Sequence, residues 1–142
     1  MFPEVKSSIL KKMKKLEEVI EILEELKRIP FEEFIKDGKT QAAAMYNLII
    51  GIEAITDVGN YFLAEKFHQA AETYEDIIKG LGEKGIISED LLKQSEGMAR
   101  FRNVLVHLYE EVEPEKVYQN LQKTPDIFRQ FAKYFQEFLE KT

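Results

Sequence analysis

One stretch of the sequence decides the fold. Residues 39–66 read KTQAAAMYNLIIGIEAITDVGNYFLAEK. At 100° per residue the apolar side chains of this stretch cover most of the circumference of a helix, although Glu53 and Asp57 interrupt them. A helix that is apolar on nearly all sides is expected at the centre of a bundle, or at a surface that also faces a partner subunit. Its apolar residues include Ala43, Tyr46, Leu48, Ile49, Ile52, Ile55, Val58, Phe62 and Leu63.

The residues before this stretch predict one long and one short helix. In residues 5–29 apolar side chains recur in steps of three and four, with lysine and glutamate on the other face. Pro30 ends that helix, and residues 30–34 open a short second one with proline in its first turn. Asp37 and Gly38 are expected to stop it. The repeating apolar positions are Ile9, Met13, Leu16, Ile20, Leu23 and Leu26.

The residues after the central stretch predict three further helical regions. A loop over residues 67–72 leads into a short helix over residues 74–81, which is closed by two glycines. Ser88 is then expected to cap a longer helix that reaches toward His107. A last region begins near Pro114 and continues to the C-terminus, and Pro125 should make its helix restart or kink.

The whole chain therefore predicts an all-α fold. No stretch alternates apolar and polar residues between turn signals, as a half-buried strand would. About five or six helices with short connections are typical of an antiparallel bundle. Repeats, low-complexity tracts and an obvious linker are absent, so residues 1–142 are expected to form a single domain.

Composition narrows the class of protein. With 44% hydrophobic and 11% aromatic residues the chain is expected to fold into a globule, and without cysteine it has no disulfide, thiolate metal site or cysteine nucleophile. The N-terminus lacks the basic and apolar regions of a signal peptide, and no apolar run approaches the roughly 20 residues that span a bilayer. A cytoplasmic protein that does not enter the membrane is the expectation.

The net charge of −6 bears on possible partners. Affinity for nucleic acid comes largely from neutralising phosphates, which an acidic chain does poorly as a whole. A nucleic-acid site would therefore need a local basic patch. A partner protein with a basic surface fits the charge equally well.

One segment carries side chains suited to chemistry: residues 101–109, FRNVLVHLY. On a continuous helix Asn103 and His107 share one face, while Arg102 and Tyr109 lie close together at the edge of the apolar stripe. Arg102 and His107 are about 140° apart on that helix. They converge only if the helix ends or bends near His107, or if a second subunit supplies a copy. The apolar stripe itself consists of Met98, Phe101, Leu105, Leu108 and Val112.

These residues also have a purely structural interpretation. A histidine near the C-terminus of a helix often interacts only with the helix dipole. Arginine and tyrosine beside a core stripe are commonly amphipathic packing residues. The residue pattern alone leaves both interpretations open.

The motif Arg-x4-His-x-Tyr, with Asn103 directly after Arg102, resembles the signature of the HEPN superfamily in its HepT-like branch. Residues 54–60, AITDVGN, are similar to a stretch that this branch carries on its second long helix. The resemblance extends from about Leu10 to Phe131 and includes residues 31–34, 40–43 and 114–118.

The resemblance implies a metal-independent ribonuclease toxin that needs no cofactor. In that family Arg and His from two protomers meet at the interface of a homodimer, and the ribose 2′-OH attacks the adjacent phosphate. His107 would be the general base or acid, since an ordinary imidazole pKa near 6.5 suits both roles. Arg102 would neutralise the charge that develops on phosphorus, and Asn103 would position phosphate or ribose.

The resemblance also implies a partner. The family toxin is paired with a minimal nucleotidyltransferase antitoxin, MntA, which transfers AMP to the tyrosine of the motif, here Tyr109. The added charge would repel RNA from the site.

Asp57 and Asn60 are expected to line the cleft or to support it, with a buried ion pair from Asp57 to Arg102 as the favoured arrangement. Gly59 should allow a close helix approach, and His68 is given no role.

Two other functions remain open. The chain could be a non-catalytic HEPN binding partner of a nucleotidyltransferase, which the acidic charge favours, or a purely structural helical dimer. The intact Arg102, Asn103 and His107 favour the enzyme. A homodimer is expected in every case, and the sequence does not specify whether the RNA would be tRNA or mRNA.

Overall fold

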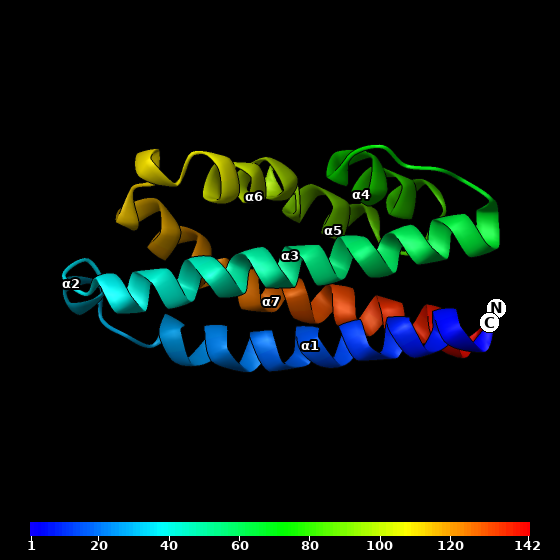
Figure 1. The fold of residues 1–142 in the computed structure, drawn as a ribbon, viewed down its shortest axis with the longest axis horizontal. Helices are drawn as coiled ribbons and strands as arrows, with labels where there is room; N and C mark the ends of the chain where they lie inside the picture. The colour runs from blue at the N-terminus through cyan, green and yellow to red at the C-terminus, as the bar shows by residue number, and fades with distance from the viewer.

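The structure is a computed structural model that describes residues 1–142, and it is helical throughout (Figure 1). The all-α prediction is confirmed. The elements in chain order are α1 (Pro3–Lys27), α2 (Phe31–Phe34), α3 (Gly38–Phe67), α4 (Tyr74–Glu83), α5 (Glu89–Gln94), α6 (Met98–His107), the 3-10 helix η1 (Tyr109–Glu111) and α7 (Pro114–Glu140).

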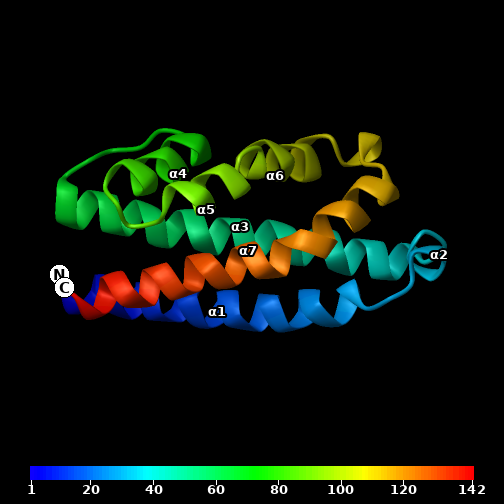
Figure 2. The same cartoon turned by 180° about the vertical axis from the view of Figure 1, so that it is seen from behind.

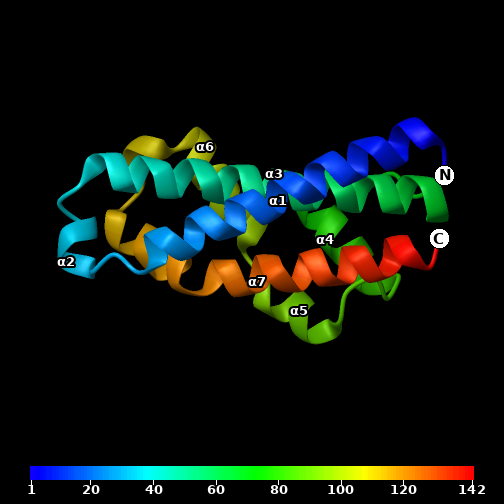
Figure 3. The same cartoon turned by 90° about the horizontal axis from the view of Figure 1, so that it is seen from below.

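Three long helices form the body of the bundle. α1, α3 and α7 pack against one another along the long axis, and both chain ends lie at the same end of the molecule (Figures 1 and 3). The shorter helices α4 and α6 pack on α3, and α5 contacts α4 and α7. Helix α3 is therefore covered by α1, α4, α6 and α7, as its apolar circumference predicted.

The core is built around α3. Gly51 of α3 lies directly beneath the buried ring of Phe128 from α7, and Gly59 lies against Ile77 and Leu81 of α4. A Cβ at Gly59 would come within 2.9 Å of both of those side chains, which confirms the close helix approach expected there. By length and composition alone α3 could span a bilayer, but 56% of its most apolar part is buried inside the bundle, as in a core helix.

Two expected boundaries differ from the structure. Asp37 is the N-cap of α3, where its carboxylate accepts from the backbone amide of Lys39 at 3.0 Å and from the Thr40 hydroxyl at 2.7 Å. The expected stop is therefore a start. The single helix predicted from Ser88 to His107 is divided into α5 and α6 by Gly97, whose φ of 81° is left-handed.

Helix α7 continues through Pro125 rather than restarting there. Proline has no amide hydrogen to donate to the preceding turn. The Thr124 hydroxyl donates to the carbonyl oxygen of Asn120 at 2.6 Å, a back-bond that is typical of bent helices. Figure 2 shows a bend in the N-terminal part of α7, and this bend corresponds to the expected kink.

Candidate active site

Helix α6 carries three of the four motif residues and ends at His107. The next residue, Leu108, has φ −126° and ψ 36°, and its amide donates to the carbonyl of Val104. Tyr109 then begins the 3-10 helix η1 and is no longer on the helix with Arg102. The helix end at His107 is one of the two conditions under which Arg102 and His107 were expected to converge.

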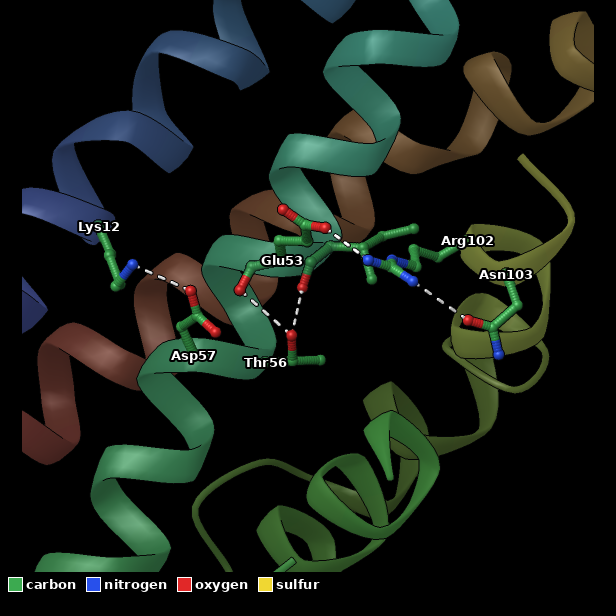
Figure 4. A network of polar contacts seen from close by, with 7 residues as sticks. Lys12, Glu53, Thr56, Asp57, Arg102 and Asn103 are labelled. Carbon is green, nitrogen blue, oxygen red and sulfur yellow. Dashed lines mark hydrogen bonds and ion pairs between the residues drawn. The ribbon is translucent and has the colours of Figure 1, made fainter. Parts of the chain in front are cut away.

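Arg102 is held on three sides. Its Nη2 donates to Oε1 of Glu53 on α3 at 2.6 Å, and its Nη1 donates to Oδ1 of Asn103 at 3.3 Å (Figure 4). The guanidinium carbon lies 4.7 Å from the ring centroid of Tyr74 at the start of α4, within cation–π range. The side chain is only 14% exposed, so the guanidinium is fixed in a partly dry environment.

One donor of this guanidinium has no partner. Nε of Arg102 is buried and makes no hydrogen bond. An unsatisfied buried donor has a desolvation cost of about 1–3 kcal/mol. The Nε and Nη2 hydrogens form one face of the arginine fork, which binds phosphate and carboxylate in a bidentate manner. Glu53 occupies half of that face, and the other half is free of any protein acceptor.

The ion pair predicted between Asp57 and Arg102 is wrong. Asp57 lies one helical turn beyond Glu53 and accepts from Nζ of Lys12 on α1 at 2.9 Å (Figure 4). That hydrogen bond raises the pKa of Lys12 above its ordinary value. Asp57 is 47% exposed, so burial does not force it to find a partner. Asn60 is exposed and makes no side-chain hydrogen bond.

His107 and Tyr109 are both exposed and free of side-chain hydrogen bonds. Tyr109 is 65% exposed, as its expected role required. Leu108 was expected in the buried stripe but is 47% exposed, because the helix has ended before it. No hydrogen bond joins Arg102 to His107 within the chain, because the guanidinium contacts Glu53, Asn103 and Tyr74 instead.

A shallow hollow of about 390 Å³ lies beside the motif. It is lined by Glu72, Thr73, Tyr74, Ile77 and Asn103, and it opens to solvent. Tyr74 thus borders both the hollow and the guanidinium of Arg102. The structure contains no group of three or more histidine, aspartate or glutamate side chains that could hold a metal ion.

Sequence reasoning missed Glu53 and Tyr74. Glu53 could have been found by the argument that was applied to Asp57, since a carboxylate on an apolar helix needs a cationic partner when it is buried. Tyr74 gave no signal, because its contact with Arg102 depends on how α4 packs against α6.

The sequence model of the family described as Ribonuclease HepT-like matches residues 16–135 of this chain. This chain belongs to that family. A protein from Archaeoglobus fulgidus that is named as a candidate RNase is 29% identical over 126 residues, which cover 89% of this chain and 93% of the relative.

Solved structures have the same fold. The Shewanella oneidensis HEPN toxin, tri-AMPylated and in complex with its MNT antitoxin, superposes with a TM-score of 0.82 at 22% identity, over 91% of this chain and 96% of the toxin. The cytosolic protein YutE from Bacillus subtilis gives a TM-score of 0.79 at 21% identity, over 96% of this chain and 91% of its own. The arrangement of the HepT-like helices is therefore that of HEPN proteins.

Proposed function

We propose that this HepT-like chain is a metal-independent endoribonuclease toxin of a toxin–antitoxin pair, acting in the cytoplasm as a homodimer. The observation that carries the proposal is the contrast between two motif residues. Arg102 is only 14% exposed and is fixed by Glu53 and Tyr74, whereas His107 is exposed and unbonded at the end of the same helix. A fixed cation and a free imidazole, brought together from two protomers, are suited to phosphodiester cleavage through the 2′-OH.

The reaction needs no group beyond these side chains and the RNA itself. One His107 removes the proton of the ribose 2′-OH, and the 2′ oxygen forms a bond to the adjacent phosphorus. The bond from phosphorus to the 5′ oxygen breaks, and an imidazolium returns a proton to that leaving oxygen. The products are a 2′,3′-cyclic phosphate and a 5′-OH end. Arg102 stabilises the charge on the phosphorane through its fixed donors, and Asn103 orients the phosphate or ribose.

A second copy of the chain completes the site in this proposal. Arg102 and His107 have no direct contact within one chain, and the protein has exposed apolar residues suited to an interface. Tyr46 of α3 is 59% exposed, and Leu108 is 47% exposed beside the motif. A two-fold axis would bury such residues against their own copies and place His107 of each protomer opposite Arg102 of the other.

The exposed Tyr109 supports a regulated toxin. Its hydroxyl is unbonded and accessible to a transferase, two residues from His107. An MntA-like nucleotidyltransferase would attach AMP there, and the phosphate would compete with RNA for Arg102. A tri-AMPylated HEPN toxin in complex with its MNT antitoxin has the same fold as this chain, which supports an MntA-like enzyme as the partner.

A second candidate function is a non-catalytic partner of a nucleotidyltransferase. The net charge of −6 favours it, since an acidic chain attracts RNA weakly. In that case the Arg102–Glu53 pair would serve only to hold α6 on α3. The two candidates differ in whether the purified protein cuts RNA.

The test is cleavage of total tRNA and mRNA by the purified protein in EDTA, with His107→Ala in parallel. The toxin should produce 2′,3′-cyclic phosphate ends, and the variant should be slower by roughly 10²–10⁴-fold. Mass spectrometry must first show that Tyr109 carries no AMP. Equal or absent cleavage in both proteins would favour the binding partner.

A further inference from the structure

The first half of α1 is the most basic segment of this acidic chain. Residues 1–16 hold five lysines and a single acidic residue, Glu4, although the whole chain has 20 basic and 26 acidic residues. Five glutamates follow in the second half of the same helix. The lysine cluster consists of Lys6, Lys11, Lys12, Lys14 and Lys15.

The fold uses only part of this charge. Lys12 pairs with Asp57, and Lys15 lies 3.7 Å from Glu18 in a loose, exposed contact. Lys6, Lys11 and Lys14 are exposed and have no carboxylate within 4 Å. Three cations on the outer face of the helix therefore lack a counter-charge in the protein.

The arrangement also opposes helix stability. Lys11 has like charges three and four residues ahead, at Lys14 and Lys15, and such pairs destabilise an isolated helix by a few tenths of a kcal/mol each. The helix dipole does not explain the cluster either, because its effect is confined to the first and last turns, where Glu4 and Lys27 already follow the favoured order. The cluster is thus explained by an external anion better than by folding.

The lysine cluster is connected to the candidate active site across α3. Lys12 contacts Asp57, and one turn away Glu53 contacts Arg102, so neighbouring positions on α3 join α1 to one side and α6 to the other (Figure 4). Helices in contact lie about 8–10 Å apart, so α1 and α6 are separated by roughly 20 Å along this path. A bound strand could reach both.

We propose that the lysine cluster binds the phosphate backbone of the RNA that leads away from the Arg102 and His107 site. This inference rests on the proposed ribonuclease function. An acidic chain needs a local basic patch in order to bind RNA, and the lysine cluster is such a patch. An anionic membrane is a poorer occupant, because the main apolar face of α1, with Ile9, Met13 and Leu16, is buried in the core, and only Met1, Phe2 and Leu10 are exposed beside the lysines.

The test measures binding of a labelled single-stranded RNA 12-mer by fluorescence anisotropy. The protein carries His107→Ala throughout, so that the RNA is not cleaved during the measurement. A triple variant, Lys6→Gln, Lys11→Gln and Lys14→Gln, should bind roughly 10- to 100-fold more weakly at 0.1 M salt. The slope of log K against log salt should fall in magnitude by about 2, as expected for three lost contacts to a single strand. In the cleaving protein the same triple change should raise KM and leave kcat unchanged.

The matched control removes the same charge elsewhere. Lys36→Gln, Lys93→Gln and Lys133→Gln change three exposed lysines that have no ion pair and lie on other helices or loops. These changes should leave the affinity for the RNA within about twofold of that of the protein with all its lysines, and the slope of log K against log salt should not change. Equal losses in both triple variants would overturn the proposal, because net charge would then explain binding.

Two further outcomes are informative. If the lysine variant loses its binding to vesicles of anionic lipid but keeps its affinity for RNA, the cluster binds a membrane and the proposal is wrong. If the RNA binds through the cluster but is never cut by the wild-type protein, the inference stands and the ribonuclease proposal fails.

Discussion

Nη2 of Arg102 lies 2.6 Å from Oε1 of Glu53, and this is the single ion pair that joins α6 to α3. The carboxylate fixes a guanidinium that is only 14% exposed, and it does so from the central helix of the bundle. Glu53 therefore acts as a positioning residue for Arg102.

Replacing Glu53 by glutamine should reduce cleavage about tenfold through kcat, with little change in KM, because Arg102 loses its anchor but keeps its charge. The loss of the partly buried pair should also lower the free energy of unfolding by roughly 1–2 kcal/mol. Both effects can be measured together, by steady-state kinetics on a labelled RNA and by urea denaturation.

Asp57→Asn is the control for Glu53→Gln. It removes the same charge one turn further along α3, from an exposed pair with Lys12 that contributes at most about 1 kcal/mol. Its kcat should match the wild type. A drop as large as that of Glu53→Gln would show that the charge on α3, rather than the contact with Arg102, matters.

Tyr109→Phe should abolish modification by an MntA-like nucleotidyltransferase and leave cleavage intact. The variant lacks only a hydroxyl that is exposed and makes no hydrogen bond, so stability should not change. Intact-mass spectrometry after incubation with ATP and the transferase measures the result. Continued AMP transfer to the variant would place the acceptor on another residue.

Gly51→Ala should destabilise the bundle by roughly 1–3 kcal/mol, because its Cβ would overlap the ring of the fully buried Phe128. The melting temperature should fall by about 5–10 °C. Gly38→Ala, at the open start of α3, has no atom within 4 Å of the new Cβ and should not lower it. Similar melting temperatures for the two variants would contradict the close packing of α3 on α7.

The stabilising effect of Asp37 should depend on pH. Hydrogen bonds from Thr40 lower the pKa of this carboxyl below its ordinary 3.8, so the ionised cap stabilises the fold above about pH 4. That contribution is lost as the pH falls through the folded-state pKa. Asp37→Asn keeps a capping acceptor without the charge, so its melting temperature should be below the wild type at pH 7, and the difference should shrink as the pH falls below about 4. A pH-independent difference would contradict this assignment.

Much of the fold followed from periodicity and turn residues. The apolar circumference of residues 39–66 predicted the central helix, and Pro30 marked the end of α1. The break at Gly97 was missed, because a glycine inside a periodic pattern is compatible with a continuous helix. At its left-handed φ the chain turns from α5, which contacts α7, into α6, which contacts α3.

The site was predictable in its residue types but not in its contacts. Arg102, Asn103, His107 and Tyr109 follow from the motif, whereas the partner of Arg102 does not. Glu53 and Asp57 are four residues apart on one face of α3, and sequence alone cannot say which of them turns toward α6.

The most direct test of the account is cleavage by a hybrid dimer in EDTA. One protomer carries Arg102→Gln and the other His107→Ala, and the hybrid is purified through two different affinity tags. Each parent dimer should be inactive, and the Arg102→Gln parent should also melt a few degrees lower, because it lacks the pair with Glu53. If Arg102 of one protomer acts with His107 of the other, the hybrid keeps one intact site of two, and its rate should be about half that of the wild type. A hybrid as inactive as its parents, beside an active wild-type dimer, would contradict the composite site.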